Sequence, residues 1–132
     1  MNVQWDGAAL LGRIALALTF VMSGFGKITG FSPTVGYIAS KDVPLPEVAA
    51  ALAVLIELGG GLAIMAGWMT RWAALALIVF MIVITPIFHD FWNLAPAEAG
   101  MQQIMFMKNV SILGGFLLLF AFGPGRYSID RR

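Results

Sequence analysis

The chain has 132 residues, of which 60% are hydrophobic and 11% charged, with a formal net charge of +1 and no cysteine. Soluble domains are typically about 45 to 50% apolar and about 25% charged, so a water-soluble fold of this size could not hide so much apolar surface, and we expect one membrane-embedded domain. The lack of cysteine excludes disulfides, thiol catalysis and cysteine-ligated metal sites, and the near-neutral charge excludes a nucleic-acid partner.

Four apolar segments dominate the sequence, at about residues 8–28, 48–69, 72–91 and 104–122. Each has about the twenty residues that cross about 30 Å of hydrocarbon as a helix. Only a helix satisfies all the backbone hydrogen bonds of a single span in lipid. We therefore predict an all-α membrane protein, a four-transmembrane-helix bundle in the lipid bilayer, with residues 1–132 forming one domain. The first segment is too long for a cleaved signal core and is expected to be retained.

The connections between these segments differ in character. Residues 29–47 contain three prolines that start or end helices: Pro33, Pro44 and Pro46. Residues 67–72 predict a tight hairpin whose tryptophans lie at headgroup level. Residues 89–103 predict an exposed loop with Trp92 as an aromatic anchor.

Orientation follows from the lysines and arginines near the ends of the spans. One side collects Arg13, Arg71, Arg126, Arg131 and Arg132. The other side collects only Lys27, Lys41 and Lys108. The excess of positive charge predicts that both termini face the cytoplasm.

Three ionisable side chains lie well inside the spans, away from the ends of the segments: Arg13, Glu57 and Lys108. Such groups cost several kcal/mol unless they are paired or wetted, so they are candidates for function. Glu57 lies near mid-membrane, between the two cations in depth, and either long cationic stem could reach it. The pattern leaves two hypotheses open: an ion pair that holds the bundle together, or a ligand, proton or quinone site. Lys108 alone also fits an interfacial residue that snorkels to the headgroups.

Small residues lie on the same helix faces as these charges. Gly60 and Gly61 lie one turn from Glu57, where they would let another helix or a flat ligand approach closely. Helix packing is the commoner use of such glycines. The arrangement predicts a compact bundle with a polar interior.

His89 is the single histidine and lies at an expected membrane interface, near Trp92. A lone interfacial histidine is more often a satisfied surface group than a functional one, so His89 and Trp92 are a secondary candidate site. Three methionines follow it, Met101, Met105 and Met107, and histidine with methionine could bind copper(I). Methionine is also a common apolar side chain on lipid-facing helix surfaces, and we predict no metal site.

The order and spacing of several short motifs resemble the DoxX family of small bacterial membrane proteins over nearly the whole chain. The motifs are residues 11–13, 23–27, 57–61, 67–71, 89–92, 108–109, 114–115 and 123–130. The resemblance implies a four-helix bundle in the bacterial inner membrane. It also implies a link to redox biology, because some relatives are named as subunits of a thiosulfate to quinone oxidoreductase and others are associated with complexes that handle oxidative stress.

Together these points favour an accessory membrane subunit, without catalysis of its own, that binds a small amphipathic ligand such as a quinone around Glu57. We expect Arg13, Gly60, Gly61, Lys108 and Asn109 to complete the site. The resemblance implies oxidoreductase subunits as partners, and the glycine-rich surface predicts that the chain forms a homo-oligomer. Two alternatives stay open: a small transporter or proton-coupled permease component, and a structural or assembly factor.

Overall fold

The computed structural model describes residues 3–131, and it is helical with no strand in that part of the chain. Arg132, counted above among the cations, lies outside it. The elements are α1 (Val3–Thr29), α2 (Phe31–Ser40), α3 (Pro46–Val54), η1 (Leu55–Gly59), α4 (Gly60–Ala66), α5 (Thr70–Phe88), η2 (Phe91–Asn93) and α6 (Pro96–Phe122). Of these, η1 is a π-helical turn and η2 a 3₁₀ turn.

Four stretches of this helical chain are long and apolar enough to cross a membrane, which confirms the predicted fold class. They are Trp5–Thr29, Pro46–Ala66, Thr70–Asn93 and Pro96–Phe122. The last begins earlier than predicted, so the expected loop over 89–103 is wrong in its second half. Pro96 supplies the fixed φ and the missing N–H that suit a first helical turn, and it starts α6 there.

The connection 29–47 also contains more structure than its prolines suggested. Residues Phe31–Ser40 form α2, and Pro46 then starts α3 as predicted. Leu45 caps α3 in the left-handed backbone conformation, with φ of 50°. The chain thus turns sharply between α2 and α3 rather than running as a loose loop.

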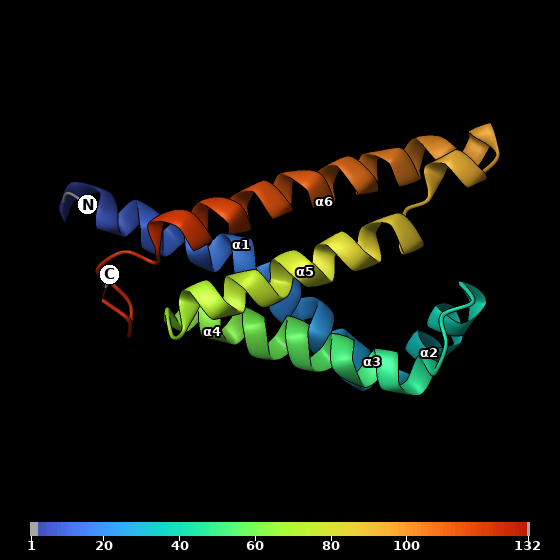
Figure 1. The fold of residues 1–132 in the computed structure, drawn as a ribbon, viewed down its shortest axis with the longest axis horizontal. Coiled ribbons are helices and arrows are strands. Elements are labelled where there is room, and N and C mark those ends of the chain that lie inside the picture. The colour runs from blue at the N-terminus through green and yellow to red at the C-terminus, as the bar shows by residue number, and fades with distance from the viewer. Residues whose placement is uncertain (1–2, 132) are drawn as a thin grey trace.

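The helices are arranged so that both chain ends lie at one end of the bundle and α2 at the other (Figure 1). α6 runs along α5, while α1 packs against η1 and α4. The predicted placement of both termini on one side therefore matches the fold. That this side is the cytoplasm stays a prediction.

The core lies where the four spans meet. Its fully or nearly fully buried side chains are Ala17, Phe20, Ile64, Ala74, Leu77, Ile78, Met81 and Phe116. α1 and η1 approach so closely that a Cβ on Gly24 would lie 2.8 Å from the backbone nitrogen of Leu58. This contact fixes the end of α1 beside the turn that carries Glu57.

Candidate functional site

Glu57 lies at the centre of the π turn and is 5% exposed. The second span is continuous from Pro46 to Ala66, but residues 55–59 are wound more widely than an α-helix. A π turn inserts one extra residue and so changes which face the following side chains occupy. Such turns are frequent at functional sites, and this one carries Glu57, the acidic side chain in the middle of the span.

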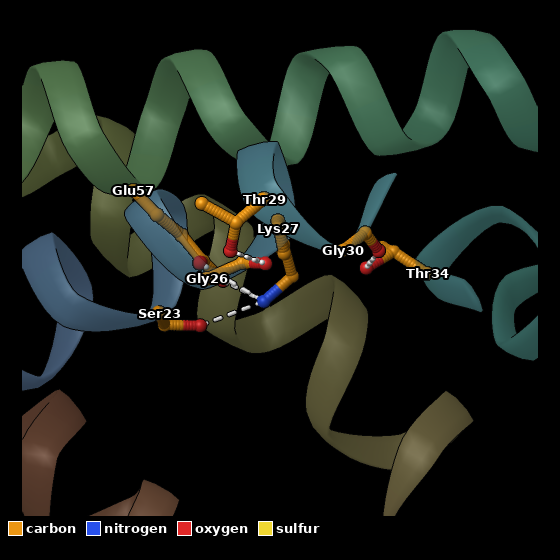
Figure 2. Close-up of polar contacts among 7 residues, drawn as sticks. All are labelled: Ser23, Gly26, Lys27, Thr29, Gly30, Thr34 and Glu57. Carbon is orange, nitrogen blue, oxygen red and sulfur yellow. Dashed lines mark hydrogen bonds and ion pairs between the residues drawn. The ribbon is translucent and has the colours of Figure 1, made fainter. Parts of the chain in front are cut away.

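Glu57 forms an ion pair with Lys27 of α1 (Figure 2). The Lys27 ammonium lies 3.0 Å from Glu57 Oε2 and 3.3 Å from Oε1, and it also donates to Ser23 Oγ at 2.7 Å. Lys27 is thus the partner of Glu57, in place of either cation considered from the sequence. Helical side chains lean toward the helix N-terminus, so the lysine stem points back along α1 past Ser23 into the membrane.

The ion pair lines a cavity of about 1050 Å³. Side chains from α1, α2, α3, η1, α5 and α6 form its walls, most of them aliphatic or aromatic, as in Phe20, Ile56 and Phe80. Its polar and charged lining includes Ser23, Lys27, Tyr37, Glu57, His89 and Asn109. A large apolar pocket with a few polar groups is the usual form of a small-molecule site.

Two contacts join α2 to the end of α5 beside this cavity. Lys41 Nζ lies 3.2 Å from Asp90 Oδ1, and the rings of Tyr37 and Phe88 are 5.4 Å apart between centroids. Tyr37 and Phe88 also line the cavity. α2 therefore covers part of the cavity and is fastened there by one surface ion pair and one aromatic contact.

His89 and Asn109 connect α5 with α6 on another wall of the cavity. His89 Nδ1 lies 2.8 Å from Gln102 Oε1, and Asn109 Nδ2 donates to Thr85 Oγ1 at 3.1 Å. Trp92 lies outside the lining, where it packs against Phe91 and Phe106. The secondary candidate pair is therefore divided: His89 belongs to the cavity and Trp92 to an aromatic cluster.

Arg13 belongs to a second polar cluster that fastens the segment 123–131 to the helices. Arg13 is 3% exposed and donates to three carbonyls: Pro124 at 2.7 Å, Tyr127 at 2.8 Å and Met65 at 3.2 Å. It lies fourteen residues before Lys27 on α1, about 21 Å along the helix axis. Arg13 therefore hydrogen-bonds to the C-terminal segment and is not the partner of Glu57.

Two carboxylates hold the same segment. Asp6 accepts from the backbone N–H of Arg126 at 3.2 Å and is 2% exposed. Asp130 accepts from the N–H groups of Met69 and Thr70 at 3.0 and 2.9 Å, and so caps the start of α5. The tight hairpin predicted over 67–72 is confirmed, and the C-terminal segment closes it.

A family model described as DoxX matches residues 8–90. The chain belongs to the DoxX family. It is 42% identical over 123 residues to inner membrane protein YphA of Escherichia coli strain K12, covering 93% of this chain and 88% of that protein. It is 44% identical over 129 residues to inner membrane protein YqjF of the same strain, covering 96% and 92%. We conclude that this DoxX protein is a multi-pass inner-membrane protein.

A more distant relative is the Surfeit locus protein 4 homolog of Drosophila melanogaster, 26% identical over 124 residues. The match covers 92% of this chain but 39% of that protein. No solved structure matches the chain.

The structure of this DoxX protein brings together only part of the site expected from the sequence. Glu57, Asn109 and His89 line one cavity. Gly60 and Gly61 do not line it: a Cβ on Gly60 would lie 3.4 Å from Leu77, and one on Gly61 2.9 Å from Val21. Both glycines therefore serve helix packing, against α5 and α1 respectively.

Lys108 is exposed on α6 and does not line the cavity. Its position agrees with a residue whose long stem snorkels to the interface. Lys27 was missed because it lies near the end of the first apolar segment and was counted only as an interfacial cation. The available signal was Ser23, one turn earlier, since residues four apart lie on one helix face.

Proposed function

We propose that this DoxX protein is an accessory membrane subunit that binds a small amphipathic ligand, such as a quinone, in the cavity beside Glu57. The observation that carries the proposal is the cavity of about 1050 Å³, apolar over most of its wall, into which the Lys27 and Glu57 pair faces. A purely structural ion pair would not need such a cavity beside it.

The chemistry of the wall suits a ligand with an apolar body and a polar head. Aliphatic and aromatic side chains would cover the ring and tail, and burying this apolar area provides most of the binding free energy. The polar lining would orient the head group. Because Lys27 and Glu57 carry opposite charges, the wall as a whole does not demand a charged ligand.

The redox role is supported by the family resemblance rather than by geometry. No cysteine is present, so electrons would have to pass through the ligand or a partner. Oxidoreductase subunits are the partners we propose. Exposed apolar side chains along α6, such as Leu117 and Leu118, offer a surface for such a subunit or a second copy of the chain.

Equilibrium binding of a short-chain quinone analogue to the protein in nanodiscs tests the proposal. We expect saturable binding at one site per chain, because the cavity is a defined volume. Ala76→Trp, which places an indole against the cavity lining, should abolish it. Ala121→Trp is the matched control, since Ala121 is exposed on α6 outside the lining and should bind as the wild type does. Uptake that never saturates, or that both variants leave unchanged, would contradict the proposal.

A further inference from the structure

The hydrogen-bonding capacity of Lys27 is already used within the protein. An ammonium group has three N–H donors and no acceptor. Lys27 directs them to Ser23 Oγ at 2.7 Å and to the two oxygens of Glu57 at 3.0 and 3.3 Å. A ligand that needed a donor from Lys27 would first have to displace one of these contacts.

Glu57, in contrast, has more hydrogen-bond acceptor positions than donors that reach them. An ionised carboxylate accepts at about four lone-pair positions. Across residues 3–131, Lys27 is the one group that donates to it, once to each oxygen. Its side chain is 7% exposed and forms part of the cavity wall. Each oxygen therefore has one donor from the protein and keeps a second accepting position that a donor on a ligand in the cavity can fill.

His89 adds a second unused acceptor to the same lining. Gln102 Oε1 lies 2.8 Å from His89 Nδ1, and the histidine tautomer that hydrogen-bonds to this oxygen carries its proton on Nδ1. In that tautomer Nε2 is an acceptor, and no donor in the described part of the chain reaches that atom. The hydroxyl of Tyr37 can take either role. Two further N–H donors of the lining, Trp72 Nε1–H and the second N–H of Asn109, lie on α5 and α6 and not on η1.

We infer that the ligand's head group is a neutral hydrogen-bond donor, a hydroxyl of the phenol or quinol class, which donates to Glu57. This inference rests on the proposed function of the cavity. A head that carries only carbonyl oxygens would face the lone pairs of Glu57 with lone pairs of its own. An anionic head would be repelled by Glu57 unless it displaced that carboxylate from Lys27. The reduced, hydroxyl-bearing form of a quinone is thus favoured over the oxidised form.

Three probes with one alkyl tail test the inference without any redox change: a 4-alkylphenol, its methyl ether and the matching 4-alkylbenzoate. Binding to the protein in nanodiscs of zwitterionic lipid is measured at neutral pH. The phenol should bind about tenfold more tightly than the ether, a difference of about 1.4 kcal/mol. The benzoate should bind more weakly than the phenol.

Variants connect this preference to the ion pair. The double variant K27M/E57L exchanges the pair for apolar side chains of similar length, and the preference for phenol over ether should disappear. Glu57→Gln, which keeps the size of the side chain and loses its charge, should reduce the preference. Lys108→Met, outside the lining, should leave it unchanged.

The outcomes separate the two proposals. Equal, saturable binding of phenol and ether would overturn the donor inference while the ligand-binding function stood. Tightest binding of the benzoate would also overturn it and would mark the ligand as an acid. If no probe bound saturably, both proposals would be overturned.

Discussion

Lys27→Met should lower the free energy of unfolding by about 3 to 5 kcal/mol, because it leaves the Glu57 carboxylate buried without its cation. Glu57 is 5% exposed, and within residues 3–131 both of its hydrogen bonds come from Lys27. Inside a membrane little water is available to solvate the carboxylate in place of Lys27, so the free-energy cost of losing the lysine is high. Unfolding of the purified protein in mixed micelles, followed by circular dichroism, measures the loss.

The double variant K27M/E57L is the control that assigns this loss to the unpaired charge. Well-packed apolar side chains often replace a buried ion pair without loss of stability. The double variant should therefore be at least as stable as the wild type, although each single variant is destabilised. A Lys27→Met protein that unfolds like the wild type would mean that the pair is not formed in the membrane.

Arg13→Met should release the C-terminal segment 123–131 and lower the free energy of unfolding by about 3 kcal/mol or more. The guanidinium donates to three carbonyls, two of them in that segment, and each would lose a charge-assisted hydrogen bond. Limited proteolysis in detergent should show faster cleavage within 123–131, and unfolding in mixed micelles should show the loss of stability.

Two further substitutions test whether the loss of stability is due to the guanidinium of Arg13. Arg13→Lys should give an intermediate effect, because one ammonium cannot reproduce the planar fork of a guanidinium. Arg71→Met should have little effect, since Arg71 is exposed. A cleavage pattern unchanged in Arg13→Met would contradict the assigned role of Arg13.

The four spans could be predicted from the sequence because length and apolarity alone decide what crosses a bilayer. The start of α6 could not be placed, since residues 96–103 are too polar for a hydropathy window although they form its first turns. α2 was missed because three prolines and two glycines make residues 29–47 resemble a loop. Proline is nevertheless compatible with the first turn of a helix.

The sequence predicted how deep in the membrane the candidate site lies, but not how the helices that form it are rotated about their axes. Sequence places Glu57 at mid-membrane, and the cost of a buried charge marks it as important. Which cation meets it depends on how α1 and the second span turn about their axes, and the π turn at 55–59 changes that rotation. The same turn explains why Gly60 and Gly61 pack against α5 and α1 instead of lining the cavity.

The role of Arg13 depended on contacts that no local pattern reveals. Its partners Pro124 and Tyr127 lie 111 and 114 residues further along the chain. The resemblance to the DoxX family drew attention to both segments, but it does not say that they touch. Only the fold shows that one buried arginine fixes the C-terminal segment while a lysine near the other end of α1 pairs with Glu57.

The central claim is that a ligand in the cavity contacts Glu57, and infrared difference spectroscopy tests it most directly. Spectra of the protein in nanodiscs are recorded with and without the 4-alkylphenol, with Glu57→Gln as the reference that lacks the carboxylate. The account predicts that ligand addition shifts a carboxylate band in the wild type and that this shift is missing in Glu57→Gln. Identical difference spectra for the two proteins, at ligand concentrations that fill the site, would contradict it.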